Sequence, residues 1–234
     1  MSFFWFPIEH LPIIILVMLV AFSTHEFGHA WTAYKLGDDT AYREGRVTLN
    51  PKAHLDWMGF LLLIVAGFGW AKPVPVRESK LRRPYRLSSI LVTAAGPVSN
   101  LVLAFLGLLV YAILFANMNI SEDMTGKLDI FFYYWVVINL NLFIFNLIPL
   151  PPLDGYRILE QFFPLRVRIR MMQYEQWTFF LFLLLIFIPP LRDVTIGPLF
   201  ALKEPILRGM HHVLEWFFSQ PASPIFEYVR DLGI

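Results

Sequence analysis

The stretch LPIIILVMLVAFSTHEFGHAWTAY, from Leu11 to Tyr34, is apolar except for a polar cluster close to its end. A helix needs roughly 20 apolar residues to cross a hydrocarbon core about 30 Å thick, so this stretch is long enough to span a membrane. Its cluster His25-Glu26-Phe27-Gly28-His29 places three ionisable side chains within five positions. Ionisable side chains inside a membrane are unfavourable and usually functional. The stretch therefore predicts both a membrane fold and a functional site.

The composition of the whole chain agrees with a membrane protein. Of its 234 residues, 57% are hydrophobic and 16% are charged, whereas soluble domains have roughly 45–50% and about 25%. The formal net charge is +1, and we therefore expect no nucleic-acid partner, because domains that bind nucleic acids carry a strong basic excess. The chain has no cysteine, so any metal must be held by His, Asp or Glu.

We predict an all-α multi-pass membrane protein with four or more transmembrane helices. The apolar stretches place the spans at about 11–34, 88–115, 130–150 and 176–191. Together with the rest of residues 1–191 they would form one transmembrane core, followed by a C-terminal interfacial segment over 192–234. In that segment, apolar residues recur at helical spacing between Glu204 and Phe218, which predicts an amphipathic helix at the membrane surface.

A fifth apolar run, Trp57 to Trp70, is short for a span, and we predict a re-entrant segment over about 57–78. Residues 35–87 contain ten Lys or Arg against five Asp or Glu, and residues 151–175 form a second basic region with four arginines. The loop 116–129 has one Lys and three acids. If the run re-enters, the basic regions face the cytoplasm, as the positive-inside rule requires. If it crossed, residues 72–86 would lie outside, so we favour re-entry.

The sequence GFGWAKPVPV, residues 67–76, has the composition of an extended turn or a β-hairpin. Its glycines, Gly67 and Gly69, and its alternating Pro-Val pairs disfavour a helix. Irregular backbone at membrane depth is tolerated only where protein or a water-filled cavity satisfies it, so this hairpin should line a cavity. Its edge could pair with an unwound substrate segment, and a structural lid is the alternative.

The polar cluster has the spacing of a zinc site. On a helix, His25 and His29 lie one turn apart on one face, and Glu26 could act as a general base. A catalytic zinc usually has a third protein ligand. We expect Asp154, which is the first charge after 24 uncharged residues and follows three helix-breaking prolines. The alternatives are two hydrogen-bonded histidines inside a bundle and an ordinary capping role for Asp154.

With these residues in view, the chain resembles the site-2 protease family of intramembrane zinc metalloproteases. The motifs HEFGH at 25–29, GFGWAKPVPV at 67–76, AGPVSN at 95–100 and NLIPLPPLDG at 146–155 occur in the expected order. The resemblance implies that Glu26 is the catalytic base and that residues 67–76 form a membrane re-entrant β-loop. It implies the zinc ligands His25, His29 and Asp154. It also implies substrate contacts at Asn146, Pro149, Pro151, Gly67, Gly69 and Asn100, the last of which belongs to a helix motif expected to serve packing first.

The resemblance implies a Zn²⁺-dependent intramembrane endopeptidase that hydrolyses a peptide bond in or near a transmembrane segment of a membrane-protein substrate. We expect a multi-pass protein of a prokaryotic plasma membrane, in contact with the lipid bilayer, with the active site opening to the cytoplasm. A homo-oligomer is left open, and no PDZ-like or CBS-like domain is expected. The alternative function is a proton- or metal-ion transporter that uses the same buried His/Glu/Asp cluster, against which few spans and the lack of paired repeats argue. His54 and Asp56 could support the metal ligands, but a role in an interfacial loop is the favoured expectation.

Overall fold

The computed structural model describes residues 7–66, 69–117 and 121–218, and these residues form helices and loops but no strand. Three helices are long and apolar enough to cross a membrane, or four if one strongly bent pair counts as a single span. The expected all-helical, multi-pass architecture is thereby confirmed. In chain order the elements are η1 (Ile8–His10), α1 (Leu11–Lys35), α2 (Thr40–Arg43), α3 (Pro51–His54), α4 (Trp57–Ala66), η2 (Glu78–Lys80), α5 (Tyr85–Asn117), α6 (Glu122–Asn146), α7 (Asp154–Glu160), α8 (Leu165–Phe187), α9 (Pro189–Thr195), α10 (Gly197–Phe200) and α11 (Lys203–Phe218).

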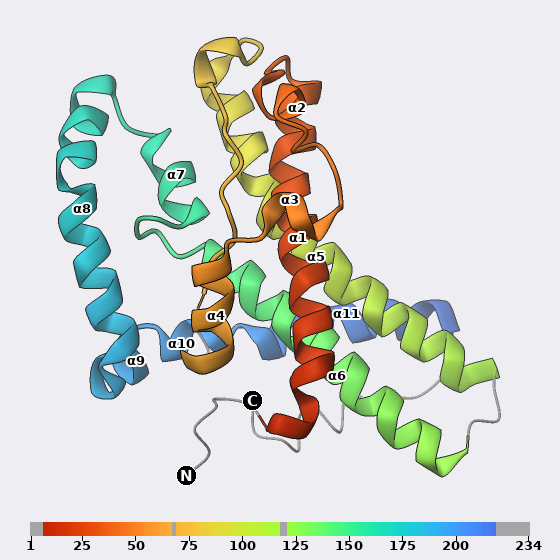
Figure 1. Cartoon of the computed structure of the whole chain (residues 1–234). Coiled ribbons are helices and arrows are strands. Elements are labelled where there is room, and N and C mark those ends of the chain that lie inside the picture. The colour runs from red at the N-terminus through yellow and green to blue at the C-terminus, as the bar shows by residue number, and fades with distance from the viewer. Residues whose placement is uncertain (1–6, 67–68, 118–120, 219–234) are drawn as a thin grey trace.

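Helices α1, α5 and α6 form the core, and glycines on α1 and α5 allow these helices to pack closely (Figure 1). A Cβ added to Gly28 of α1 would lie 2.7 Å from the carbonyl oxygen of Ala95 on α5. A Cβ added to Gly107 of α5 would lie 2.3 Å from Cδ1 of Trp135 on α6. Close approach at small residues is a common way for helices to associate in lipid, where the hydrophobic effect between helices is lost.

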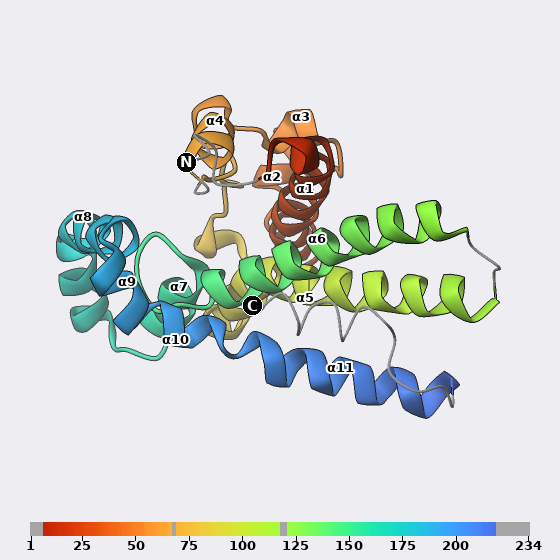
Figure 2. The same cartoon turned by 90° about the horizontal axis from the view of Figure 1, so that it is seen from below.

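Helix α11 lies alongside α5 and α6, as Figure 2 shows. Leu207 and Leu214 of α11 are buried in the same cluster as the apolar residues of the three core helices, whereas Trp216 is exposed. The helix predicted between Glu204 and Phe218 is therefore present and amphipathic, and its position at a membrane surface stays a prediction.

The observed bounds of α6 differ from the predicted span 130–150. The helix begins at Glu122, and its Asp129 accepts a hydrogen bond of 2.8 Å from the hydroxyl of Tyr111 on α5. Tyr111 therefore gives a hydrogen-bond partner to Asp129, whose charge lies outside the span predicted from hydropathy. The helix ends at Asn146 because residues 147–153 form turns that contain three prolines, which cannot continue a helix.

The helix at the predicted span 176–191 has different bounds from that span. Helix α8 begins earlier, at Leu165, and ends at Phe187, and α9 follows at an angle of 100°. The bend falls where Pro189 begins α9, because proline fits the first turn of a helix but not its interior.

Helix α4 spans ten residues, and the chain then returns beside it. A Cβ added to Gly59 would lie 2.2 Å from the carbonyl oxygen of Trp70, so the returning chain touches the first turn of the helix. The predicted β-hairpin is not seen among the described residues, where 69–77 carry neither strand nor helix. Pro73 and Pro75 have no N–H to donate to a strand ladder, which accounts for the difference.

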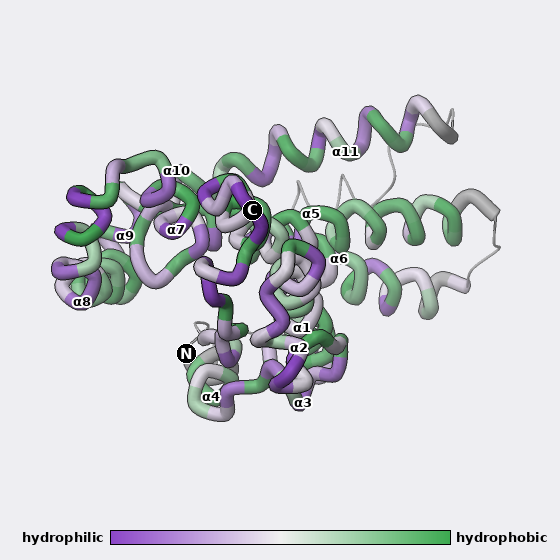
Figure 3. The backbone as a smooth tube through the Cα atoms, turned by 90° about the horizontal axis from the view of Figure 1, so that it is seen from above, coloured by the Kyte–Doolittle hydropathy of each residue, from purple (hydrophilic) through white to green (hydrophobic). Residues whose placement is uncertain are grey.

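Several hydrophilic segments lie at one end of the molecule. Figure 3 shows hydrophilic colouring over α2, over the chain that leads into α5 and over the first turns of α8, whereas most of α5 is hydrophobic. In Figure 1 these three segments lie together at the top. These segments belong to the two basic regions of the sequence, residues 35–87 and 151–175, so parts of both regions lie at the same end of the molecule.

Candidate metal centre

Three side chains from α1 and α7 bring their ligand atoms together. Nε2 of His25 and Nε2 of His29 are 3.1 Å apart, and they lie 3.2 and 3.4 Å from Oδ2 of Asp154. Ligand atoms bound tetrahedrally at about 2.0–2.1 Å from zinc are separated by about 3.3 Å. The triangle therefore has the dimensions of three zinc ligands, and it is the one group of three or more such residues found among the described residues.

The other ring nitrogen of each histidine is held by an oxygen that can only accept. Nδ1 of His25 donates to Oδ1 of Asn100 at 2.7 Å, and Nδ1 of His29 donates to the carbonyl oxygen of Val92 at 2.8 Å. With the proton on Nδ1, Nε2 of each ring presents a lone pair. Such partners fix the tautomer and orientation of histidine ligands in metal sites.

The donor set fits a zinc ion. Oδ2 of Asp154 is buried and has no hydrogen-bond donor among the described residues. It faces two imidazole lone pairs, an arrangement of three acceptors that is unfavourable unless a cation or extra protons lie between them. Two histidines and one carboxylate form a common protein ligand set of catalytic zinc.

Two glycines allow this convergence. A Cβ on Gly96 of α5 would lie 2.3 Å from Nε2 of His29 and 2.8 Å from Cε1 of His25. A Cβ on Gly155 would lie 2.2 Å from the carbonyl oxygen of Leu147, so α7 begins tightly packed on the turn that follows α6. That packing places Asp154, the first residue of α7, beside the two rings of α1.

Glu26 lies next to the triangle. Its side chain is largely buried, and its Oε2 accepts a hydrogen bond of 3.0 Å from the backbone N–H of Val74. Glu26 and the three candidate ligands line the same cavity. The carboxylate is thus available to a water or substrate beside the metal position.

The cavity has a volume of about 610 Å³, within the range of about 300–1,000 Å³ of ligand sites. It is enclosed by α1, α5, α6, α7, α8 and residues 69–76. Its lining contains both aromatic and polar side chains. The aromatic residues are Phe22, Trp70, Phe145, Phe179 and Phe182, and the charged and polar residues include Glu78, Ser89, Arg157 and Glu160.

The residues expected to contact substrate are placed differently from one another. Asn146 and Gly69 line the cavity, and Nδ2 of Asn146 donates to the carbonyl oxygen of Leu142 at 2.9 Å. Pro149 is exposed and Pro151 is buried, and neither belongs to the cavity lining, to which Pro152 contributes instead. Gly67 lies outside the described residues.

Asn100 does not line the cavity. It is fully buried, and besides accepting from His25 it donates through Nδ2 to the carbonyl oxygen of Ala21 at 3.1 Å and to Oδ1 of Asn139 at 3.0 Å. Its geometry favours orientation of the metal centre over substrate contact. Asn139, which no sequence motif indicated, is part of the same chain of hydrogen bonds.

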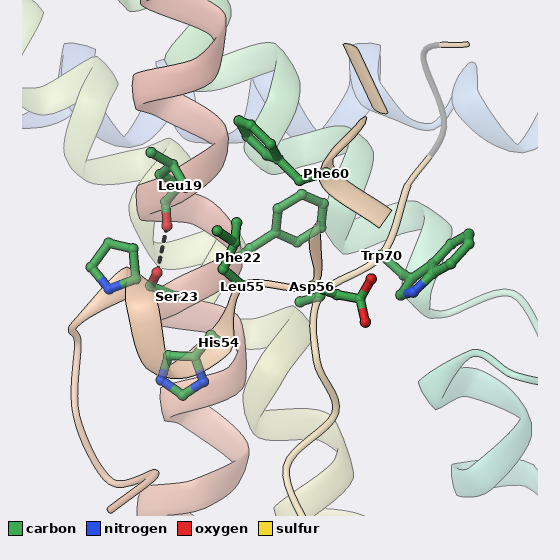
Figure 4. Close-up of a pocket in the computed structure, with 10 residues that line it drawn as sticks. Leu19, Phe22, Ser23, His54, Leu55, Asp56, Phe60 and Trp70 are labelled. Carbon is green, nitrogen blue, oxygen red and sulfur yellow. Dashed lines mark hydrogen bonds between the residues drawn. The ribbon is translucent and has the colours of Figure 1, made fainter. Parts of the chain in front are cut away.

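His54 and Asp56 lie in a separate, small cavity of about 20 Å³ between α1, α3 and α4 (Figure 4). Nε2 of His54 donates to the carbonyl oxygen of Thr48 at 2.8 Å, and burial lowers the pKa of this histidine. Oδ1 of Asp56 accepts from the N–H of Gly59 at 2.9 Å in the first turn of α4. Both side chains therefore organise the loop between α1 and α4.

Three groups near the cavity were not indicated by any sequence motif. They are the backbone N–H of Val74 and the buried side chains of Arg46 and Asp38. From the sequence alone, a single charged residue in a polar loop is expected to have a solvent-exposed side chain. The alternating prolines of PVPV indicated an extended segment but not its contact with Glu26.

Comparison with known proteins agrees with this chemistry. The model of peptidase family M50 matches residues 115–189. The chain is 46% identical to YwhC of Bacillus subtilis (strain 168) over 88% of this chain and 94% of that protein. It is 30% identical to Rip2 of Mycolicibacterium smegmatis over 97% of this chain and 81% of that protein, and 28% identical to Rip2 of Mycobacterium tuberculosis (strain H37Rv) over 89% and 80%. All three bear the name "Putative zinc metalloprotease". No solved structure matches.

Proposed function

The chain belongs to peptidase family M50 and is a zinc metalloprotease, and on this premise we propose that His25, His29 and Asp154 hold the zinc and that Glu26 is the general base. The observation that carries the assignment is the triangle of ligand atoms, with separations of 3.1–3.4 Å. The Nδ1 atoms of both histidines are already engaged, which leaves Nε2 free for the metal.

Zinc bound there supplies Lewis acidity, which polarises a substrate carbonyl and makes water easier to deprotonate. Glu26 accepts a proton from the attacking water and delivers it to the leaving amine nitrogen. Asn100 and the Val92 carbonyl hold the two imidazole rings, so neither ring has to reorient during turnover. The aromatic part of the cavity lining lowers the local polarity around the reacting groups.

The substrate in this proposal is a membrane protein, cleaved in or near a transmembrane segment. A transmembrane helix hides its carbonyl groups in its own hydrogen bonds, so the scissile segment must unwind to reach Glu26. Residues 69–76 run along the cavity as non-helical chain and offer backbone groups with which an unwound segment could pair. Such pairing would satisfy the backbone groups that unwinding releases. Asn146, at the other wall, would add a side-chain contact.

The distribution of charge supports one orientation in the membrane. Parts of the two basic regions lie at one end of the molecule (Figure 1), and each region contributes a charged side chain to the cavity lining, Glu78 and Arg157. The positive-inside rule would place this end in the cytoplasm. We therefore propose a plasma-membrane protein of a prokaryote whose cavity opens to the cytoplasmic side. Ion transport is no longer needed to explain the buried cluster, because family membership accounts for it.

The test is zinc content and peptide cleavage, measured on the same purified samples of the wild type, Asp154→Ala and Glu26→Gln. The probe is a pool of synthetic transmembrane peptides with Gly, Pro or Asn near their centres, and cleavage is read by mass spectrometry. We expect about one zinc per chain in the wild type and in Glu26→Gln, and little in Asp154→Ala. Only the wild type should cleave.

Asp193→Ala is the matched control, because Asp193 is exposed and forms an ion pair with its own neighbour, Arg192. This variant should keep both zinc and cleavage. Full zinc in Asp154→Ala would contradict the ligand assignment, and cleavage by Glu26→Gln would contradict the base assignment.

A further inference from the structure

The sequence KPVPVR, residues 72–77, is held in an extended form by its own composition. Proline fixes its own φ and biases the residue before it toward extended conformations, which applies to Lys72 and Val74. Arg77 is extended as well, with φ of −111° and ψ of 100°. Because Pro73 and Pro75 have no N–H, Val74 and Val76 supply the N–H donors of residues 73–76.

The start of this segment is anchored by Arg46. The Arg46 side chain is 5% exposed, and its Nη2 donates to the carbonyl oxygens of Lys72 at 2.5 Å and of Pro73 at 3.4 Å. The N–H of Lys72 donates to the carbonyl oxygen of His54 at 2.8 Å. A guanidinium gives charge-assisted hydrogen bonds, which are stronger than neutral ones, so the chain immediately before Val74 is fixed in place.

The end of the segment is anchored by Asp38. This carboxylate is fully buried, and its Oδ2 accepts from the N–H of Arg77 at 2.6 Å. Its Oδ1 accepts from the N–H of Thr40 at 3.0 Å and from the hydroxyl of Thr40 at 2.5 Å. Both carboxylate oxygens are thus engaged, and the segment is held at each end by a buried charge.

Between the two anchors, the N–H of Val74 donates to Oε2 of Glu26 at 3.0 Å. A free glutamate side chain has three rotatable bonds and many orientations. A hydrogen bond from an anchored backbone removes most of them. It engages Oε2 and leaves Oε1 as the oxygen for proton transfer.

We propose that the backbone N–H of Val74 is a positioning group for Glu26, and that Arg46 and Asp38 keep this N–H in place. The proposal rests on the proposed role of Glu26 as the base. It assigns different tasks to the two donors of the segment: the N–H of Val74 orients the base, and the N–H of Val76 is offered to the substrate.

Amide hydrogen exchange of the peptide that covers residues 71–77 tests the bond without substrate. In the purified full chain, slow exchange should be present in the wild type and in Glu26→Gln, whose side-chain oxygen still accepts. Exchange should become about tenfold faster in Glu26→Ala and Arg46→Ala. Arg46→Lys, which keeps a donor, should restore part of the protection. Unchanged exchange in Glu26→Ala would overturn the proposal.

The kcat and KM for one cleaved peptide of the transmembrane peptide pool test the positioning role. Val74→Pro removes the N–H and suits an extended backbone, and Val76→Pro is the matched change on the neighbouring donor. Val74→Pro should lower kcat about 10- to 100-fold with KM and zinc content unchanged. Val76→Pro should mainly raise KM.

Equal losses of kcat in the two proline variants, or wild-type kcat in Val74→Pro, would overturn the proposal and leave the zinc assignment standing. Cleavage by Glu26→Gln would instead refute the base assignment itself. If Val74→Pro does not fold, the proposal is decided by comparing the amide hydrogen exchange of residues 71–77 in Glu26→Ala with that in Glu26→Gln.

Discussion

Nδ1 of His25 donates a hydrogen bond of 2.7 Å to Oδ1 of Asn100, so a side chain of α5 sets the tautomer of a ring on α1. Asn100 in turn donates to Oδ1 of Asn139 on α6, and Nδ2 of Asn139 donates to the carbonyl oxygen of Trp135 at 2.8 Å. The amide of Asn100 is thereby fixed with its oxygen toward the ring. One chain of hydrogen bonds links the three core helices to the proposed metal ligand.

Replacing Asn100 with Leu should weaken zinc binding about 10- to 100-fold, as losses of such partners do in other metal sites. The isosteric side chain fills the space but gives His25 no acceptor, so the ring can rotate or carry its proton on Nε2. Competition with a chromogenic chelator measures the affinity. Ser99→Ala is the control, because its hydroxyl bonds to the backbone carbonyls of Gly96 and Thr24 and not to a ligand side chain. Wild-type affinity in Asn100→Leu would mean that the bond is dispensable.

Gly96→Ala should abolish zinc binding. The new methyl group would lie 2.3 Å from Nε2 of His29, the atom assigned to the metal, and relief would require α5 to move away from α1. Gly126→Ala on α6 is the matched control, because nothing lies within 4 Å of its added Cβ. Zinc content of the two purified variants distinguishes a local effect from a general effect of alanine. Normal zinc content in Gly96→Ala would show that the helices separate easily.

Gly155→Ala should act on the same centre from the other side. Its Cβ would lie 2.2 Å from the carbonyl oxygen of Leu147 and 2.7 Å from that of Ile148, so the start of α7 would shift and carry Asp154 with it. We expect zinc content to fall nearly as far as in Asp154→Ala. Gly209→Ala on α11, which has open space around it, should retain zinc. Equal zinc in both variants would contradict this packing argument.

The parts of the fold and site that could be predicted are those that depend on local sequence. Hydropathy placed α1 and α5, because a membrane span needs only a run of apolar residues. Helical periodicity placed His25 and His29 on one face. Asp154 was predictable as their partner because a lone carboxylate after prolines is conspicuous in an apolar chain. The structure brings all three within 3.4 Å.

The remainder depends on tertiary contacts that no local pattern encodes. Asn100 belongs to a motif expected to serve packing first and substrate contact second, and its hydrogen bond to His25 was not expected from the sequence. The start of α8 was missed because its first turns carry arginines, which hydropathy excludes from a span although helix geometry does not. One of them, Arg168, has acidic partners on both η2 and α7.

That arginine belongs to a polar cluster at the charged part of the cavity lining. Glu78 accepts from Ser89 at 2.9 Å, from Gln161 at 2.9 Å and from Arg168 at 3.3 Å, and Arg168 also lies 3.5 Å from Glu160. Burial alone would raise the pKa of Glu78, but the hydrogen bonds from Ser89 and Arg168 outweigh it and hold the pKa below its usual range. Burial raises the pKa of Glu160. The charged form of Glu78 is therefore the form that joins η2 to α5, α7 and α8.

Glu78→Gln should lower the thermal midpoint of the detergent-solubilised protein by about 2 °C at pH 7. The effect is modest because the ion pair of Glu78 with Arg168 is partly exposed. A folded-state pKa below the unfolded value stabilises the fold above the unfolded pKa, and this contribution disappears as the pH falls through the folded pKa. The gap between the variant and the wild type should therefore close as the pH falls below the ordinary pKa of a glutamate and through the lower folded-state pKa of Glu78. Unfolding followed by intrinsic fluorescence at pH 7 and below pH 4 measures both gaps. Glu44→Gln, at an exposed glutamate in the loop after α2, should show no comparable gap at pH 7. A gap for Glu78→Gln that stays constant with pH would show that its carboxylate charge does not hold the cluster together.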